Sequence, residues 1–399
     1  MSLREAVRVA AQALIANRLR SALTMLGVLI GVMSVVLLVA IGQGAREEIT
    51  GAIEGLGSNL LFVLPGDGDF GAGPSRSQFV LDDVERLERD LPGTGARVAA
   101  STVSAEPVQA EGTRQNVTVL AVTAGYPEVL NREVARGLGF TESDVATSRR
   151  TAVLGATTAA DLFGNQDPIG RTVGIGGVQF RVTGVLARVG GGGGFSFGPD
   201  QDRTVLIPAS TGQRLFGTDR IDSIFVRASS TATIEQDRAI VERVLGQRVS
   251  EDDFSVVSQD EIIGVVGDIL SILTTVLGAI AGISLLVGGV GVSNIMLVSV
   301  SERTREIGLR KALGARTRDI TLQFLFEAIA LTVIGGAIGL ALGIGGAEVV
   351  ATFAPVPAAV TWWSVVLALG VSTGVGLLFG VLPARRAGRL DPVEALRRD

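Results

Sequence analysis

The feature that most constrains the fold of this chain is a short charged segment, residues 299–319, which lies between two long apolar runs. The run before it, residues 269–301, holds 33 residues without a formal charge. From Ile320 onward the sequence is again apolar, and Glu327 is its only charged residue before Glu348. About 20 apolar residues are enough to cross a bilayer as a helix. The charged segment is therefore predicted to be a loop between two transmembrane helices.

The charges of this segment predict its side of the membrane and its local structure. Its basic residues outnumber its acidic ones, which by the positive-inside rule places it in the cytoplasm. Glu306 and Arg310 are four residues apart in the order that stabilises a helix, and Gly314 follows where a helix would end. Residues 301–313 are thus predicted to form a short amphipathic helix at the cytoplasmic surface. The alternative is a solvated turn that only enforces topology.

The sequence of this segment, SERTREIGLRKALGA, resembles the ABC-transporter permeases of the MacB/FtsX type, as do NIMLVSV before it and LQFLFEA after it. In such permeases this element is the short helix on which the ATPase subunit docks. The resemblance assigns that contact to Glu302, Arg303, Arg305, Glu306, Arg310, Lys311 and Gly314. It also implies that the partner ATPase binds ATP and Mg²⁺, and that this chain holds no cofactor.

The remaining apolar runs complete a prediction of an α-helical membrane protein with four transmembrane helices and both termini in the cytoplasm. A cleaved signal peptide is the alternative for the first run, but its apolar core exceeds the usual ~7–15 residues. The predicted order is a basic cytoplasmic lead-in (1–20), a first helix with stalk (21–57), a second stalk and helix (262–300), the cytoplasmic helix and loop (301–319), a third and a fourth helix (320–350 and 361–383) and a cytoplasmic tail (384–399).

Residues 58–261 are too polar for lipid and are predicted to form an extracytoplasmic α+β domain inserted between the first and second helices. Their β-α-β patterns at both ends indicate two lobes, one of them discontinuous. The expected inner lobe comprises residues 58–122 and 221–261, and the inserted lobe residues 123–220. This element order resembles the extracytoplasmic domain of MacB. The motif VLGATTAADLFGNQDPIGRTVGIGGVQFRVTGVL predicts a helix, a turn and a hairpin, which is a folding unit without chemistry of its own.

Three further features are candidates for function. Glu327 is an acid inside a membrane run and so a functional candidate; alternatively it snorkels or pairs with a loop arginine. The glycine stretch 190–194, followed by Phe195 and Phe197, predicts a flexible flap that contacts substrate or a partner, or else a plain hairpin loop. Glycines at four-residue spacing predict close helix packing or sliding helix surfaces: Gly27 and Gly31, Gly278 and Gly282, Gly335 and Gly339, Gly370 and Gly374.

The composition argues against catalysis in this chain. The sequence has no cysteine and no histidine, so thiol chemistry and the commonest general base and metal ligand are excluded. No segment has the form GxxxxGK[ST] that binds nucleotide phosphates. The acidic pairs Asp82–Asp83 and Asp252–Asp253 are interpreted as solvated surface, and no metal site is expected. No basic patch with interleaved aromatic residues indicates nucleic-acid binding.

These observations and the resemblance together predict a permease subunit in the cell membrane, where it contacts lipids. Two copies would pair with two copies of an ABC ATPase, and ATP-driven movement would reach the outer domain for export of antibiotics, peptides or lipids. An extracytoplasmic adaptor is a further expected partner. The alternatives are an FtsX-like scaffold that activates a cell-wall hydrolase, a lipoprotein-releasing permease, and a stand-alone receptor. The size of the outer domain favours the exporter.

Overall fold

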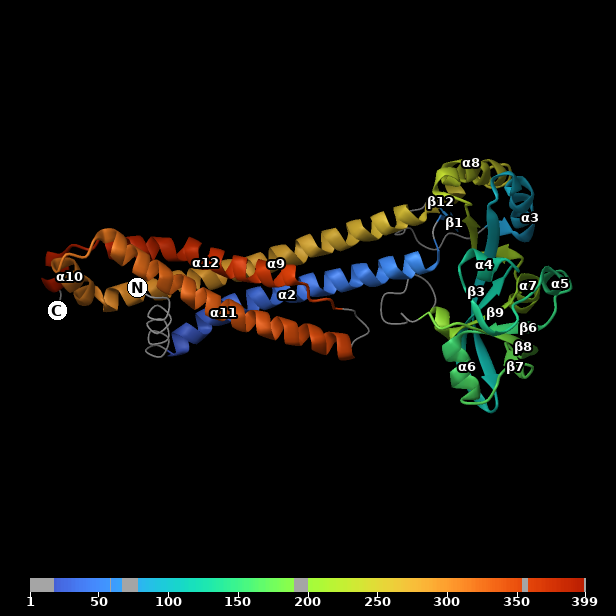
Figure 1. Cartoon of the computed structure of the whole chain (residues 1–399), viewed down its shortest axis with the longest axis horizontal. Helices are drawn as coiled ribbons and strands as arrows, with labels where there is room; N and C mark the ends of the chain where they lie inside the picture. Colours follow the sequence, from blue (N-terminus) through green and yellow to red (C-terminus); the bar gives the residue numbers. More distant parts are fainter. Residues whose placement is uncertain (1–17, 58, 67–77, 190–199, 354–357, 398–399) are drawn as a thin grey trace. The chain divides into compact units, whose positions relative to one another are not determined.

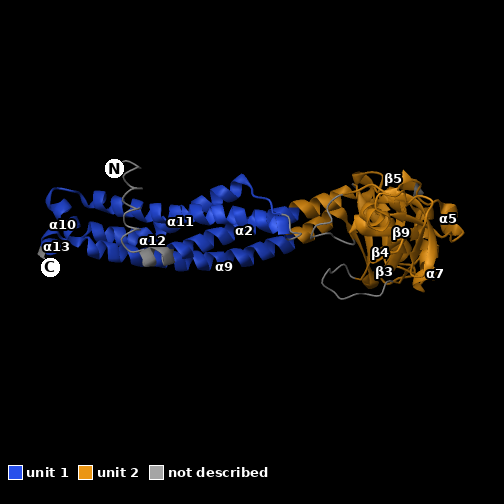
Figure 2. Cartoon of the chain, turned by 90° about the horizontal axis from the view of Figure 1, so that it is seen from below, with its two compact units in different colours: residues 1–46, 268–399 blue, residues 47–267 orange. Residues whose placement is uncertain are grey.

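The computed structural model describes residues 18–57, 59–66, 78–189, 200–353 and 358–397 (Figure 1). The chain divides into two compact units, which Figure 2 shows in different colours. Unit 1 comprises residues 1–46 and 268–399, and unit 2 comprises residues 47–267. The elements of each unit follow from its sequence pattern, because unit 1 draws on the apolar runs and unit 2 on the polar region between them.

Within the described residues, four helices are long and apolar enough to cross a membrane. They are α2 (Arg18–Gly55), α9 (Gln259–Glu302), α11 (Thr317–Phe353) and α12 (Trp362–Gly388). At about 1.5 Å per residue, α2 and α9 extend for about 57 and 66 Å, against a hydrocarbon core of about 30 Å. Parts of both helices therefore lie outside the hydrocarbon. Two short helices, α10 (Thr304–Ala312) and α13 (Pro392–Arg397), also belong to unit 1.

The helices of unit 1 pack through small residues around an aliphatic core. Val32 of α2, Phe324 of α11 and Ala368 of α12 are buried in that core. A Cβ atom built on Gly27 would lie 2.8 Å from the Cα atom of Gly288, and one built on Gly339 would lie 2.6 Å from the carbonyl oxygen of Leu29. Neither distance leaves room for a side chain, so glycine at these positions lets α2 approach α9 and α11 backbone to backbone.

Unit 2 is an α+β domain, and it lies in the sequence between the first and second long helices, which confirms the predicted fold class. Among the described residues, ten strands form one sheet in the order β12-β1-β11-β3-β4-β9-β6-β8-β5, with β7 paired to β3 and β8. Their bounds are β1 Leu60–Pro65, β3 Arg97–Ala110, β4 Thr113–Val122, β5 Val134–Gly137, β6 Thr151–Leu154, β7 Thr172–Ile175, β8 Val178–Leu186, β9 Thr204–Pro208, β11 Ser223–Arg227 and β12 Phe254–Ser258.

Two further strands, β2 (Phe79–Val80) and β10 (Arg220–Ile221), form a separate antiparallel pair. The helices of unit 2 are α3 Leu81–Asp90, α4 Tyr126–Val129, α5 Glu142–Ala146, α6 Ala156–Phe163, α7 Ala209–Phe216 and α8 Ile234–Leu245. The motif that begins at Val153 forms the predicted folding unit, since α6 is followed by a turn and by the antiparallel hairpin of β7 and β8.

The sheet contributes to several hydrophobic cores, and β3 has residues in two of the larger ones. Val98 and Ala100 lie in one core with residues of α3 and α8, whereas Val108 and Ala110 lie in the other with residues of α6 and β8. The division between the lobes therefore falls inside β3, earlier than the predicted boundary after residue 122. The reason is the pairing of β4, which runs parallel to β9 of the inserted segment from Thr118↔Thr204 onward. A sequence pattern shows that a strand exists but not which strand it pairs with.

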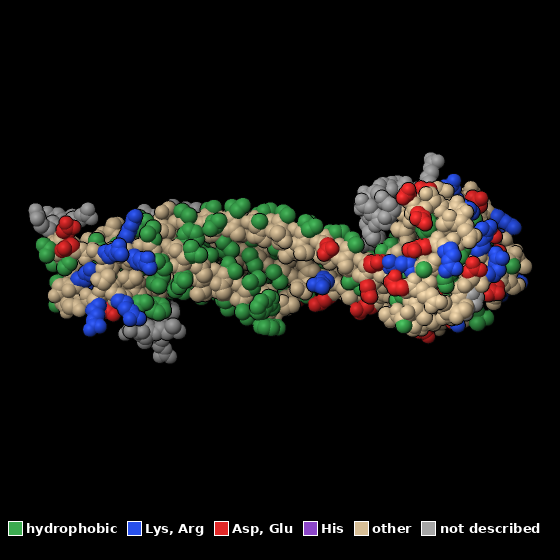
Figure 3. All heavy atoms as spheres, turned by 90° about the horizontal axis from the view of Figure 1, so that it is seen from above, with side chains coloured by type: hydrophobic (Ala, Val, Ile, Leu, Met, Phe, Trp, Pro, Cys, Tyr) green, Lys and Arg blue, Asp and Glu red, His purple; other side chains and the backbone are tan. Residues whose placement is uncertain are grey.

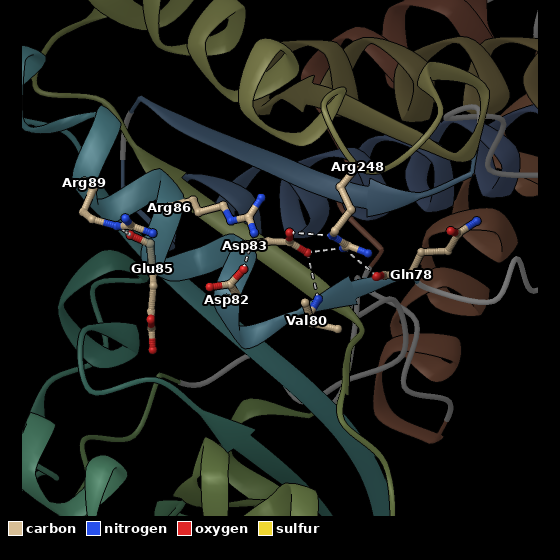
Figure 4. Close-up of polar contacts among 8 residues, drawn as sticks. All are labelled: Gln78, Val80, Asp82, Asp83, Glu85, Arg86, Arg89 and Arg248. Atoms are coloured by element: carbon tan, nitrogen blue, oxygen red, sulfur yellow. Dashed lines mark hydrogen bonds and ion pairs between the residues drawn. The ribbon is translucent and has the colours of Figure 1, made fainter.

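A buried ion pair joins α3 to the segment that follows α8 (Figure 4). Asp83 accepts a hydrogen bond from the Val80 amide at 2.9 Å and from Arg248 Nε at 2.8 Å, and Arg248 Nη2 also donates to it. The Asp83 side chain is 3% exposed, so its interpretation as solvated surface is wrong. Asp82 does lie at the surface, where it pairs with Arg86 at 2.6 Å. The partner of Asp83 is 165 residues away in sequence, so no local sequence pattern could predict this ion pair.

Candidate functional site

The predicted docking helix is α10 of unit 1, and the backbone conformation explains where it begins and where it ends. α9 ends at Glu302 and α10 begins at Thr304, with Arg303 between them in a non-helical conformation (φ −101°, ψ 14°). At the other end Gly314 adopts a φ of 99°, its amide donates to Lys311 O, and the Ala315 amide donates to Arg310 O, both at 3.0 Å. These two bonds close a helix C-terminus around a left-handed glycine. The helix begins three residues later than predicted, because α9 continues through residue 302.

One side of α10 is covered by α13. A Cβ atom on Gly308 would lie 2.7 Å from the Ala395 Cβ, and Ile307 and Ala395 are both buried. Lys311 Nζ donates to Leu390 O at 2.8 Å, which ties the end of α10 to the residue before the α13 turn. From the sequence this region is predicted only to be a basic cytoplasmic tail. A helix-start signal was present, however, because Asp391 precedes Pro392 and accepts from the Val393 amide at 2.8 Å.

Glu327 of α11 is paired with the residue that separates α9 from α10. Its carboxylate is 3% exposed, and Arg303 Nη1 lies 3.3 Å from Oε1 and 3.4 Å from Oε2. Of the interpretations offered by the sequence, the geometry is that of a carboxylate paired with a loop arginine. The pair links α11 to the start of α10, as does the bond from Arg310 Nη1 to Gln323 Oε1 at 3.3 Å.

The residues assigned to docking by resemblance divide into three groups. Arg303 and Lys311 make the contacts within the chain given above, so their charges are engaged. Glu306 and Arg310 form the predicted ion pair at 2.6 Å, with both side chains still well exposed. Glu302, Arg305 and Gly314 are exposed to solvent.

Apolar side chains that the resemblance did not include lie beside this charged surface. Leu309 and Leu313 of the same segment are 54% and 81% exposed, and Val393 and Leu396 of α13 are also exposed. Figure 3 shows lysine and arginine side chains gathered at the end of unit 1 that carries these helices, next to a region covered by hydrophobic side chains. The exposed face of α10 thus combines Arg305 and a Glu306–Arg310 pair with leucines, a composition suited to a protein partner.

The predicted packing glycines also divide into two groups. Gly27, Gly31, Gly335 and Gly339 lie against neighbouring helices of unit 1. Gly278, Gly282, Gly370 and Gly374 would meet no atom of the described residues within 4 Å if a Cβ were added. The second group therefore lies on helix faces of α9 and α12 that the described part of the chain leaves open.

Two other predictions concern absent or undescribed features. The flap with Phe195 and Phe197 lies outside the described residues. Among the described residues there is no group of three or more acidic side chains that could hold a metal ion.

Comparison with known families decides what kind of protein carries this helix. Residues 21–244 match the model of the MacB-like periplasmic core domain, and residues 278–392 match the model of the FtsX-like permease C-terminal domain. The chain belongs to the MacB/FtsX family of ABC transporter permeases. The MacB-like match covers most of unit 2, and the FtsX-like match contains the whole of α10 and α11.

Relatives with similar sequences support this membership over nearly the whole chain. The macrolide export ATP-binding/permease protein MacB of Azoarcus sp. (strain BH72) is 42% identical over 393 residues, which cover 98% of this chain and 59% of that protein. The uncharacterized ABC transporter permease YknZ of Bacillus subtilis (strain 168) is 37% identical over 402 residues, which cover both chains fully. The chain thus spans the full length of the YknZ permease but about three fifths of the Azoarcus MacB protein.

Solved structures of MacB/FtsX permeases also resemble part of the chain. The periplasmic region of MacB from Actinobacillus actinomycetemcomitans is 24% identical, with a TM-score of 0.44, and the match covers 54% of this chain and 95% of that structure. The extracellular domain of the noncanonic ABC-type transporter YknZ from Gram-positive bacteria is 22% identical, with a TM-score of 0.41, and covers 50% and 100%.

Proposed function

We propose that this membrane permease couples ATP hydrolysis on a separate ABC ATPase subunit to movement of its extracytoplasmic domain. The observation that carries the proposal is the two-sided environment of α10. One side packs against α13 at Gly308, while Arg305, Leu309 and Leu313 remain exposed. A short helix that is anchored on one side and free on the other is suited to receive a partner. ATP and Mg²⁺ would be bound by that partner, and no catalytic step is assigned to this chain.

The contacts of α10 support a mechanical role for it. Arg303–Glu327 and Arg310–Gln323 connect α10 to α11, and Lys311 connects it to Leu390. A force applied to the exposed face would therefore move the neighbouring helices with α10 instead of only bending a loop. Arg303 also follows α9 directly, so movement of α10 would act on the end of that helix.

The side of the membrane and the stoichiometry are part of the same proposal. The excess of basic residues around α10 favours a cytoplasmic location for this end of the chain, with both termini on that side. Two copies of the permease would assemble with two ATPase subunits. The open glycine faces of α9 and α12 would be available for packing between copies.

Export is the proposed outcome of this coupling. Two observations favour it: the MacB-like match of residues 21–244, and the relative named as a macrolide export protein. The cargo would be an antibiotic, a peptide or a lipid, handled by the extracytoplasmic domain with or without an adaptor protein.

The first test is affinity purification of the tagged full chain from its native membrane in mild detergent, followed by mass spectrometry. We expect an ABC-type ATPase at about one copy per permease. The variant Arg305→Glu should lose the ATPase because it reverses a charge on the exposed face of α10. Arg114→Glu, a change of an exposed arginine on β4, should retain it.

Three results would count against the proposal. Absence of any ATPase, even after crosslinking in the presence of trapped ATP, would exclude the coupling role. Full ATPase recovery with Arg305→Glu would place docking elsewhere. Recovery of a peptidoglycan hydrolase bound to the extracytoplasmic domain would favour a signalling scaffold over an exporter.

A further inference from the structure

Unit 2 contains an apolar cavity of about 230 Å³ that is separate from the docking surface. Strands β1, β4, β9 and β11 supply its walls through Phe62, Leu120, Leu206 and Phe225. Phe225 forms edge-to-face contacts with both Phe62 and Tyr126, at centroid distances of 5.8 Å, so the aromatic wall is held in a defined geometry. The remaining lining includes residues of the helices α2, α4 and α9.

A buried arginine interrupts this apolar lining. Arg132 lies between α4 and β5, is 7% exposed, and lines the cavity. Its Nη2 donates to the Gln201 carbonyl oxygen at 3.0 Å, whereas its Nη1 has no hydrogen-bond partner among the described residues. A buried donor without a partner costs free energy comparable to a lost hydrogen bond, and more for a charged group. A guanidinium that belongs to the lining of an apolar cavity thus has one donor without an acceptor among the described residues.

Arg132 remains positively charged in this environment. Burial lowers the pKa of Arg132, and the nearby Asp202 carboxylate acts in the opposite direction. Burial raises the pKa of Tyr126, on the same lining, to about 12, so its hydroxyl stays neutral and adds no negative charge. An arginine guanidinium in a protein remains protonated, and a carboxylate is the acceptor that fits its planar fork best.

We propose that this cavity binds a medium-chain aliphatic carboxylate, with the carboxylate on Arg132 and the chain against the aromatic and aliphatic walls. Size sets the length of the chain. An apolar cavity of about 150 Å³ accommodates benzene, so 230 Å³ has room for about nine or ten non-hydrogen atoms. Octanoate has this size and this chemistry. The inference concerns binding to unit 2 and does not depend on the proposed coupling to an ATPase.

The ligand would contact both chain segments that enter unit 2 from the long helices. Ile53 of α2 and Ile262 of α9 line the cavity, and Gln259 Nε2 donates to the Ile53 carbonyl oxygen at 2.9 Å. These ends of α2 and α9 are thus joined to each other beside the site. Occupancy of the cavity would stabilise that junction, because the ligand adds apolar contacts to both helix ends.

Photolabelling tests the proposal on the full chain in lipid nanodiscs. The probe is octanoate that carries an aliphatic diazirine, and labelled peptides are mapped by mass spectrometry. We expect label on cavity-wall segments such as 120–132 and 201–206. Unlabelled octanoate should compete about tenfold better than octanol, because a charge-assisted hydrogen bond contributes on the order of 1.5 kcal/mol or more.

Two arginine variants separate recognition from general surface charge. Arg132→Met should lower cavity labelling about tenfold and abolish the preference for octanoate over octanol. Arg136→Met is the matched control, because Arg136 lies four residues away on β5, is exposed, and pairs with Asp167 at 2.6 Å. The cavity labelling of Arg136→Met should equal that of the wild type. A diazirine derivative of octanol should still label Arg132→Met, which shows that the cavity has remained intact.

A cavity-filling variant tests the same site while Arg132 is unchanged, so the test does not depend on Arg132→Met folding correctly. Ser223→Phe adds a ring to the wall without changing the arginine, and it should reduce labelling by both probes. Equal competition by octanol and octanoate would overturn the proposal, since it would show an apolar cavity without carboxylate recognition. Label confined to the membrane-spanning helices would overturn it as well, because it would show only partition into lipid.

Discussion

Arg303 Nη1 lies 3.3 Å and 3.4 Å from the two carboxylate oxygens of Glu327, and this ion pair joins the junction of α9 and α10 to the interior of α11. The carboxylate is almost fully buried, while the guanidinium retains some solvent contact. Removal of one partner from such a pair leaves a buried charge without compensation, which costs more than removal of both.

The first prediction follows from this asymmetry. Arg303→Met should destabilise unit 1 by about 3 kcal/mol, because Glu327 would remain buried and unpaired. The double variant Arg303→Met/Glu327→Leu should recover most of that loss. Thermal unfolding of the purified protein in detergent, followed through a double-mutant cycle, measures the difference. Equal stability of wild type and Arg303→Met would show that the pair contributes nothing.

The second prediction separates the glycines that pack within the chain from those that do not. Gly339→Leu should impair folding, because its side chain would overlap the backbone of Leu29 on α2. Gly278→Leu should leave a monomer folded, because the described chain has no atom within 4 Å of the new Cβ. Size-exclusion profiles and melting temperatures of the two variants compare them directly. Loss of a dimer peak in Gly278→Leu alone would further assign that face to contacts between copies.

The third prediction concerns the buried pair in Figure 4. Arg248→Ala should cost unit 2 about 3 kcal/mol, because Asp83 would keep only its bond from the Val80 amide. Arg86→Ala is the control, because Arg86 lies on α3 with Asp83 but pairs with the exposed Asp82. Its loss should lower the free energy of unfolding by only about 0–1 kcal/mol. Denaturant unfolding of the full chain, monitored by hydrogen exchange of α3, resolves the two. Similar losses of stability in both variants would contradict the predicted difference between the buried and the exposed ion pair.

The fourth prediction is a pH dependence at Asp144. A backbone hydrogen bond from Thr141, a further bond from its hydroxyl, and Arg149 hold the pKa of Asp144 below its ordinary value of 3.8. The Asp144 carboxylate therefore binds a proton more readily in the unfolded chain than in the folded one. Its contribution to stability is fully present when the pH is above the ordinary pKa, and it is lost as the pH falls below that pKa. Asp144→Ala should cost about 1 kcal/mol at pH 7 as a lost capping contact.

The measurement for Asp144 is the difference in unfolding free energy between wild type and Asp144→Ala as a function of pH. The difference should be constant from pH 5 to pH 8 and should shrink as the pH is lowered toward 3. Asp161→Ala, an exposed acid on α6, provides a control without such a capping contact. A difference that grew on acidification would contradict the assigned direction of the pKa shift.

Local sequence patterns were sufficient to predict much of this fold. Charge-free runs of membrane length predicted the four long helices, and the spacing of Glu306, Arg310 and Gly314 predicted a short helix that closes at a glycine. These signals are local, because each arises from residues within one or two helical turns. The same locality explains why the motif that begins at Val153 was predicted as a helix, a turn and a hairpin.

The features that the sequence did not reveal depend on contacts between distant segments. Nothing near Asp83 indicates Arg248, and nothing near Arg132 indicates that its guanidinium lines a cavity formed by strands from both halves of unit 2. The glycine stripes look alike in sequence, yet Gly339 packs against α2 and Gly278 does not. Periodicity identifies a face of a helix, but only the tertiary arrangement determines what that face contacts.

The strand β3 has a consequence for how unit 2 can move and unfold. Its 14 residues run without interruption from the core that holds Val98 to the core that holds Val108, and β4 pairs with it along ten of them. A hinge between the lobes would have to break this ladder, so the two lobes should reorient little relative to each other. Unfolding of either core would also break the β3–β4 pairing that supports the other core. Unit 2 should therefore unfold in one cooperative transition.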